Sequence, residues 1–172
     1  MKHKNQGIII MQERGENAVV AVVMGSQSDK PVMAECLRHL EFFGIPFQEH
    51  ILSAHRTPDQ TAEFARTAHQ AGIKIIIAAA GMAAHLPGVI AAHTTLPVIG
   101  VPLAGSELNG IDALYSMVQM PSGVPVATMA IGKAGAINAA VLAAEILGIT
   151  DQQINNKLLE FKKHGCKLQK LV

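Results

Sequence analysis

Short apolar runs that alternate with segments of helical spacing most constrain how this chain can fold. The runs lie at residues 18–24, 46–52, 73–80 and 96–102, with a weaker one at 124–131. They are rich in Val and Ile and are bounded by Gly, Pro or Ser, as buried strands are. Because strand and helix alternate, the sequence predicts an α/β fold in which helices cover both faces of a mostly parallel sheet.

The segments between the runs carry the signals of helices. Residues 31–43 place their apolar side chains three or four positions apart, and Gly44 follows as a stop signal. A second helix is expected at 58–71, where Pro58 follows Thr57, a residue type favoured as a helix cap.

The C-terminal third predicts two more helices. Residues 133–147, KAGAINAAVLAAEIL, are apolar nearly all round, so this helix is expected to be buried on several sides, including by subunit packing. A last helix is expected at 151–163. Five strands and these helices predict a three-layer, flavodoxin-like, doubly wound parallel sheet with an extra C-terminal helix. Residues 18–172 are predicted to be a single domain ending in a tail, and residues 1–17 a disordered extension.

The composition narrows the class of protein. The chain has 172 residues, 49% of them hydrophobic, which suits one domain with a substantial core. Only 16% are charged, whereas about 25% is typical of soluble domains, so we expect further surface to be buried in a homo-oligomer. A net charge of +1 predicts neither a nucleic-acid nor a membrane partner.

Two further features favour a cytoplasmic protein. Cys36 and Cys166 have no disulfide or metal-site spacing and are expected to be free thiols of a reducing compartment. The apolar stretch GIIIM near the start is too short for a signal peptide or a membrane span.

Polar or glycine-containing loops follow three of the predicted strands. They are MGSQSD at 24–29, SAHRT at 53–57 and GMAAHLPG at 81–88. Ligands of open parallel sheets bind beyond the carboxyl ends of the strands, where such loops meet. The sequence therefore predicts one site built from these three loops.

The first loop is suited to an anion. Gly25 allows a tight turn, Ser26 and Ser28 supply hydroxyls, and Asp29 lies where a helix begins, with free backbone N–H groups nearby. The motif is neither GxGxxG nor a P-loop, so binding of a nucleoside triphosphate is not expected. Ser28 and Asp29 could equally serve as helix caps, which does not prevent them from touching a ligand.

The other two loops bring proton-carrying and cationic groups. Arg56 offers a permanently charged fork for phosphate or carboxylate, and His55 can exchange protons near neutral pH. His85 lies in the third loop, but a zinc site would require a third protein ligand, and no loop supplies one, so no metal is expected. Serine-nucleophile chemistry is not indicated, because there is no GxSxG elbow. The remaining histidines are interpreted as structural: His3, His39, His50, His69, His93 and His164.

Six motifs in order carry a family resemblance. They are VVMGSQSD, SAHRTP, AAHLPG, LPVIGVP, YSMVQMPSGVPVATMAIGKAGAINAA and LAAEILG. Together they closely resemble the class I PurE family, the N5-carboxyaminoimidazole ribonucleotide mutases of purine biosynthesis. The resemblance spans roughly residues 18–148. It implies a cytoplasmic, cofactor-independent isomerase that assembles as a homo-octamer, with a possible functional link to the synthetase that makes its carbamate substrate.

The resemblance also implies roles for individual residues. The carbamate carboxyl of a phosphoribosyl aminoimidazole would leave N5 as carbon dioxide, stay in a closed pocket and attach to C4. His55 matches the general acid/base, and Ser26, Asp29 and Arg56 match residues that hold the ribose phosphate. Other positions expected to line the substrate site are Gly25, Ser28, Ser53, Gly81, Ala83 and His85.

Two positions depart from the family pattern, and two other functions compete. Ala79 stands where the family usually has Gly, and Met82 where it often has Gly, and their side chains are expected to narrow the carboxyl pocket or constrain its backbone. The alternative enzyme is a class II carboxylase that uses free carbon dioxide, although AAHLPG favours class I. The alternative outside catalysis is a flavodoxin-like binding or receiver module, which the 3% of aromatic residues and the lack of clustered acidic residues at the strand ends disfavour.

Overall fold

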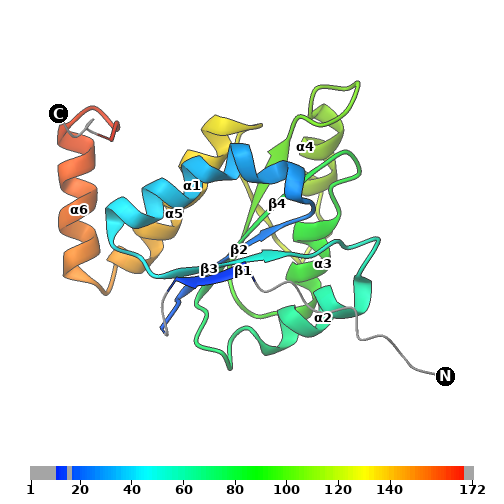
Figure 1. The fold of residues 1–172 in the computed structure, drawn as a ribbon, viewed down its shortest axis with the longest axis horizontal. Coiled ribbons are helices and arrows are strands. Elements are labelled where there is room, and N and C mark those ends of the chain that lie inside the picture. Colours follow the sequence, from blue (N-terminus) through cyan, green and yellow to red (C-terminus); the bar gives the residue numbers. More distant parts are fainter. Residues whose placement is uncertain (1–10, 15–16, 169–172) are drawn as a thin grey trace.

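One mixed sheet organises the part of the chain that the computed structural model describes, residues 11–14 and 17–168 (Figure 1). Its strands are β1 (Met11–Arg14), β2 (Val20–Met24), β3 (Phe47–Ile51), β4 (Ile75–Gly81), β5 (Val98–Leu103) and β6 (Ala127–Thr128). Their order across the sheet is β1-β3-β2-β4-β5-β6, and all pairs are parallel except β1 with β3. The five parallel strands follow the flavodoxin-like doubly wound order, which confirms the predicted fold.

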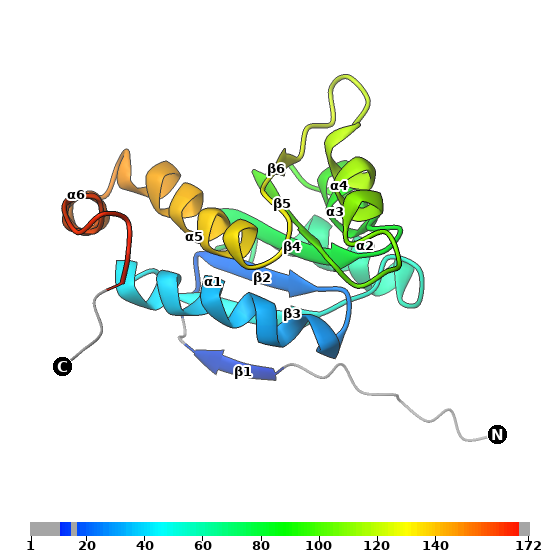
Figure 2. The same cartoon turned by 90° about the horizontal axis from the view of Figure 1, so that it is seen from above.

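Helices cover both faces of this sheet (Figure 2). They are the short 3₁₀ helix η1 (Gln27–Asp29), α1 (Lys30–Phe43), α2 (Pro58–Thr67), α3 (Leu86–His93), α4 (Ile111–Val118), α5 (Lys133–Gly148) and α6 (Gln152–Lys163). Helices α1 and α5 pack on one face with α6 beyond them, and α2, α3 and α4 pack on the other. The layers are thus the three that were predicted, although α4 is not among the predicted elements. No described helix is long and apolar enough to cross a membrane.

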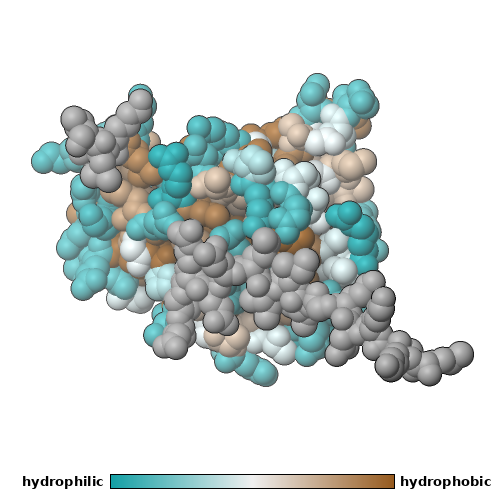
Figure 3. All heavy atoms as spheres, in the orientation of Figure 1, coloured by the Kyte–Doolittle hydropathy of each residue, from teal (hydrophilic) through white to brown (hydrophobic). Residues whose placement is uncertain are grey.

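Helix α4 and the turn before it leave apolar side chains at the surface. Leu108, Ile111, Tyr115 and Val118 are each at least half exposed. They recur at steps of three and four, so they share one side of the helix. We call these four residues the α4 apolar face. In the space-filling view, apolar residues come to the surface at the upper right, where α4 and its neighbouring loop lie (Figure 3).

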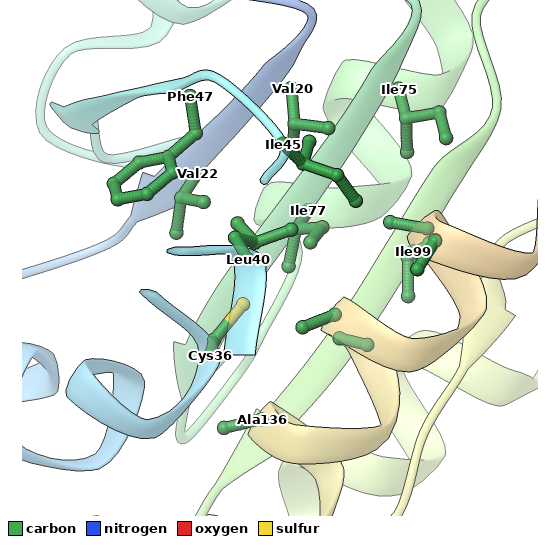
Figure 4. Packing of buried hydrophobic residues seen from close by; sticks show 14 of the residues in the cluster. Val20, Val22, Cys36, Leu40, Ile45, Phe47, Ile75, Ile77, Ile99 and Ala136 are labelled. Atoms are coloured by element: carbon green, nitrogen blue, oxygen red, sulfur yellow. The ribbon is translucent and has the colours of Figure 1, made fainter. Parts of the chain in front are cut away.

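The core has one part on each face of the sheet because side chains alternate along each strand. In β2, Val20, Val22 and Met24 face α1 and α5, whereas Ala21 and Val23 face the opposite layer, and all five are fully buried. Figure 4 shows the first of these clusters, in which strand side chains meet those of α1 and α5. Full burial of one such Val, Ile or Met stabilises the fold by about 1.5–3 kcal/mol.

The alanine-rich helix α5 is enclosed within the chain itself. Its buried positions are small, which lets it lie close to the sheet: Gly135, Ala136, Ala139, Ala140, Ala143 and Ala144. The sheet, α1 and α6 contact it from different sides. The prediction that α5 is buried on several sides is confirmed, but its apolar composition does not by itself require a second subunit.

Helix α6 is fixed by a cap and an aromatic cluster. The Asp151 carboxylate accepts the backbone N–H groups of Gln153 and Ile154. The Phe161 ring packs edge-on against Phe43, with ring centroids 5.4 Å apart. The extra C-terminal helix of the prediction is therefore an integral part of the α1–α5 layer.

The structure differs from the prediction at the two edges of the sheet. Met11–Arg14, predicted to belong to a disordered extension, form β1 and pair with β3; residues 1–10 and 15–16 lie outside the described residues. At the other edge, the run at 124–131 yields only the two residues of β6. Pro125 cannot donate a ladder hydrogen bond, which helps to confine pairing to residues of the run that follow it.

Candidate active site

The three predicted loops converge on one cavity at the carboxyl edge of the sheet. The register aligns Met24 of β2 with Ile51 of β3 and Ala79 of β4, so the loops after these strands start at the same level. The cavity has a volume of about 490 Å³. It is lined by Gly25, Ser26, Ser28, Asp29, Ser53, Ala54, His55, Arg56, Ala80, Gly81, Met82, Ala83, His85, Leu86 and Gly105.

All ten residues predicted for the site line this cavity, so the structure brings together positions from three separate loops. Sequence reasoning did not select Ala54, Ala80, Leu86 or Gly105, which also line it. Ala54, Ala80 and Leu86 lie in or beside the predicted motifs. Gly105 follows β5, and the only signal for it is its place just after a strand that ends at the same edge.

The loop after β2 is organised by its own side chains. The backbone N–H of Ser26 donates to Asp29 Oδ2 over 2.9 Å, and Ser26 Oγ accepts from the Ser28 N–H over 3.4 Å. This is a capping box around η1. Burial raises the pKa of Asp29, while hydrogen bonds from Ser26 and Ser28 and the charge of Arg56 act in the opposite direction. The capping role considered for Asp29 is therefore real, and the same carboxylate borders the cavity.

Arg56 ties the first loop to the second. Its Nη2 donates to the carbonyl oxygen of Gly25 over 3.0 Å, and its Nε lies 3.5 Å from Ser53 Oγ. The side chain is exposed, and a guanidinium has five N–H donors, so further donors can meet a ligand. A fixed cation beside Ser26, Ser28 and Ser53 suits an anionic, oxygen-rich group.

The loop that carries His55 is held by hydrogen bonds to Thr57. Thr57 Oγ1 accepts the backbone N–H of Ser53 over 2.9 Å and donates to the Ser53 carbonyl over 3.1 Å. Thr57 occupies the N-cap position of α2 as predicted, but its hydroxyl turns back to Ser53 instead of capping that helix. The result is a closed turn with His55 at its exposed tip.

His55 and His85 meet across the cavity. His55 Nε2 and His85 Nδ1 are 2.8 Å apart, and the two rings stand nearly perpendicular at 81° with centroids 4.9 Å apart. The loop before His85 makes a tight turn in which the backbone N–H of His85 donates to the Ala83 carbonyl over 2.8 Å. The two histidines are separated by 30 positions in sequence, so their contact depends on the fold that brings the loops after β3 and β4 together.

The wall after β4 is apolar and closely packed. A side chain at Gly81 would place its Cβ 3.2 Å from the Leu103 carbonyl oxygen, so the glycine allows β4 and β5 to end close together. Met82 adopts a positive φ of 56°, is 61% exposed and borders the cavity. Ala79 is fully buried in β4 and does not line the cavity. The expected narrowing can therefore come from Met82 but not directly from Ala79.

Most of the other histidines occupy different surroundings, while His3 lies outside the described residues. His39 is buried, with its Nδ1 2.6 Å from the Glu35 carbonyl oxygen. His69 and His93 border a second cavity, of about 420 Å³, with Arg66. Within residues 11–14 and 17–168, no group of three or more His, Cys, Asp or Glu side chains could hold a metal ion.

Comparison with known proteins places this cavity in a family. The chain is 53% identical over 155 residues to an N5-carboxyaminoimidazole ribonucleotide mutase of Pyrococcus horikoshii, covering 90% of this chain and 86% of the relative. It is 56% identical over 144 residues to the protein of the same name from Thermotoga maritima, covering 84% and 83%. The crystal structure of Treponema denticola PurE superposes with a TM-score of 0.76 at 28% identity, covering 85% of this chain and 90% of that one.

The family assignment covers nearly the whole described domain. Residues 19–167 match the family described as AIR carboxylase. The match includes every strand from β2 to β6 and all three loops of the cavity. This chain belongs to the AIR carboxylase family.

Proposed function

We propose that this protein is an N5-carboxyaminoimidazole ribonucleotide mutase. It moves the carboxyl group of the substrate from N5 to C4 and gives 4-carboxy-5-aminoimidazole ribonucleotide, a step of purine biosynthesis. The observation that carries the proposal is that one cavity is lined by His55 and His85, by apolar residues after β4, and by Arg56 with the hydroxyls of Ser26, Ser28 and Ser53. One end suits a phosphoribosyl group and the other a small ring that exchanges protons.

Binding is assigned to the two loops after β2 and β3. Arg56, with Ser26 and Ser28, holds the phosphate of the ribose phosphate, since a guanidinium and hydroxyls together satisfy several phosphate oxygens. Asp29 borders the same region and can accept a hydrogen bond from a ribose hydroxyl. Because these groups are fixed by the capping box and by the Arg56–Gly25 hydrogen bond, the substrate finds them already in position.

The proton balance of the reaction requires one group that both gives and takes a proton. When the bond from N5 to the carboxyl carbon breaks, carbon dioxide leaves and N5 gains a proton. When C4 bonds to the carbon dioxide, C4 loses its hydrogen as a proton and the ring becomes aromatic again. His55 performs both transfers, because an imidazole can donate and accept near neutral pH.

The apolar wall retains the released gas molecule. Ala80, Gly81, Ala83 and Leu86 line the cavity and offer neither carbon dioxide nor water a strong hydrogen-bond partner in their side chains. Holding carbon dioxide beside C4 makes the second step effectively intramolecular. The reaction as written needs no electron transfer and no cofactor.

The assembly and cellular setting are part of the proposal. The resemblance points to a homo-octamer in the cytoplasm. Its carbamate substrate would come from the synthetase that makes it. The α4 apolar face supports an oligomer, because large side chains that recur on one helix side usually pack against another surface. The low fraction of charged residues agrees with buried subunit surface.

The test uses the position of a label. The protein is given substrate carrying ¹³C in the carbamate carboxyl, in buffer containing unlabelled bicarbonate, and the carboxyl of the product is analysed. A mutase yields labelled product without needing bicarbonate. Product formed only from aminoimidazole ribonucleotide and bicarbonate would identify a class II carboxylase, and no product from either substrate would reject both enzymes.

A further inference from the structure

The contact between His55 and His85 assigns His85 a role beyond lining the cavity. Both rings are exposed to the cavity, and the separation of 2.8 Å between His55 Nε2 and His85 Nδ1 is that of a hydrogen bond. Only one hydrogen can lie between these two nitrogens, so one ring donates and the other accepts. The contact therefore links the protonation states of the two nitrogens.

The surroundings of His55 show which atom remains for the substrate. Apart from His85, no other side chain or backbone group of the described residues hydrogen-bonds to the His55 ring. Its Nε2 is committed to His85, which leaves Nδ1 to face a ligand. A base whose second nitrogen is held by another group is a recurring arrangement in acid–base catalysis, because that second contact sets tautomer and orientation.

We propose that His85 is a positioning residue that accepts the Nε2–H of His55 on its own Nδ1. This inference rests on the proposed function for its chemistry and on the observed contact for its geometry. His55 then starts as an imidazolium and gives its Nδ1 proton to N5 of the substrate. The neutral ring keeps Nε2–H on His85, and its Nδ1 lone pair takes the proton from C4, so His55 ends as it began.

The loop between β4 and α3 holds His85 in position to contact His55. His85 is the residue just before α3, and the hydrogen bond from its N–H to the Ala83 carbonyl and the positive φ of Met82 set the conformation of the loop between β4 and α3. Pro87 at the start of α3 restricts the backbone on the other side. A histidine on a loop fixed in this way can hold His55 without moving far itself.

Two substitutions of His85 distinguish the effect of losing its hydrogen-bond acceptor from the effect of losing its imidazole ring. In His85→Asn, the amide oxygen can occupy the place of Nδ1 and accept the same hydrogen. In His85→Leu, a side chain of similar size offers no acceptor. His85 is exposed, so both variants should fold, which thermal unfolding verifies.

Steady-state kinetics supply the first readout. We expect His85→Leu to lower kcat about tenfold with little change in KM, whereas His85→Asn keeps most of kcat. Equal kcat in the two variants, or a rise in KM with kcat unchanged in both, would overturn the positioning role.

Nitrogen NMR of the free protein supplies a second readout that needs no turnover. With ¹⁵N-labelled histidine, and His55→Asn to assign the signal, neutral His55 should carry its hydrogen on Nε2 in the wild type. It should lose this preference in His85→Leu. A neutral His55 that carries its hydrogen on Nδ1 in the wild type would overturn the inference even if the protein proves to be an active mutase. If the proposed reaction itself fails, this spectrum still tests the contact.

Discussion

Two histidines five positions apart in the sequence lie in opposite kinds of surroundings. His50 belongs to β3 and is largely buried, with its ring 4.7 Å from that of Phe64 and its Nε2 without a hydrogen bond among the described residues. Burial lowers its pKa. His55 stands at the exposed tip of the next loop, paired with His85.

The difference between His50 and His55 shows how the environment of a histidine changes where a strand ends and a loop begins. Inside the sheet, an imidazole is kept from water and from partners, so carrying a charge there is unfavourable. One turn later, backbone and side-chain hydrogen bonds replace packing as the source of order, and a ring can meet both a ligand and a second ring. The same residue type thus changes from a structural group to a reactive one over a single loop.

Of the substitutions proposed here, replacement of His55 is expected to have the largest effect on turnover. His55→Asn should reduce turnover by about 10²–10⁴-fold, the usual contribution of a positioned acid/base, with substrate affinity and thermal stability nearly unchanged. His69→Asn, at an exposed position that follows α2 and does not line the cavity, is the matched control and should behave as wild type. Near-normal turnover in His55→Asn would remove His55 from its proposed role.

The neighbouring cation should matter for affinity. Arg56→Ala is expected to raise KM more than about tenfold, which exceeds the 1 kcal/mol or less that an exposed ion pair usually contributes. Arg66→Ala removes an arginine that pairs only with Glu63 on the surface of α2 among the described contacts, and it should leave KM unchanged. If both variants have the same KM, the phosphate is held by other groups.

Sequence reasoning succeeded where the physical signal is local. The strands β2 and β4 are short runs made almost entirely of Val, Ile and Ala, and β3 and β5 are short segments that end in apolar residues, so their type and position follow from the sequence. Gly44 adopts a positive φ of 71° at the end of α1, as the stop signal indicated. The residues of the candidate site could be selected because each motif directly follows one of these strands.

Contacts that depend on register could not be predicted in this way. The pairing of His55 with His85 requires β3 and β4 to end level on either side of β2, which no local pattern specifies. The strand β1 was missed because three of residues 11–14, MQER, are polar and the segment does not alternate as a buried strand would. Edge strands tolerate such sequences, since one side of the ladder has no partner.

His50 should impose a pH dependence on stability. Its pKa is lowered in the folded protein, so below about pH 6.5 the unfolded chain binds a proton that the folded chain resists. The free energy of unfolding should therefore decrease as the pH falls through this window, by at most about 1.4 kcal/mol per pH unit for one proton. Urea unfolding of the wild type and of His50→Leu at pH 5–7 measures this, and equal slopes would show that another group causes the acid sensitivity.

The smallest effect tests what orders the loop around His55. Thr57→Ala removes both hydrogen bonds between its hydroxyl and the Ser53 backbone, and it should lower the free energy of unfolding by about 1 kcal/mol. Thr57→Ser keeps the hydroxyl and should recover most of this loss. Since His55 lies within the turn that these bonds close, kcat should fall only modestly in Thr57→Ala and return in Thr57→Ser. If the alanine variant matches the serine variant in both stability and kcat, packing of the loop, as around His50, would be sufficient to hold the reactive histidine in place.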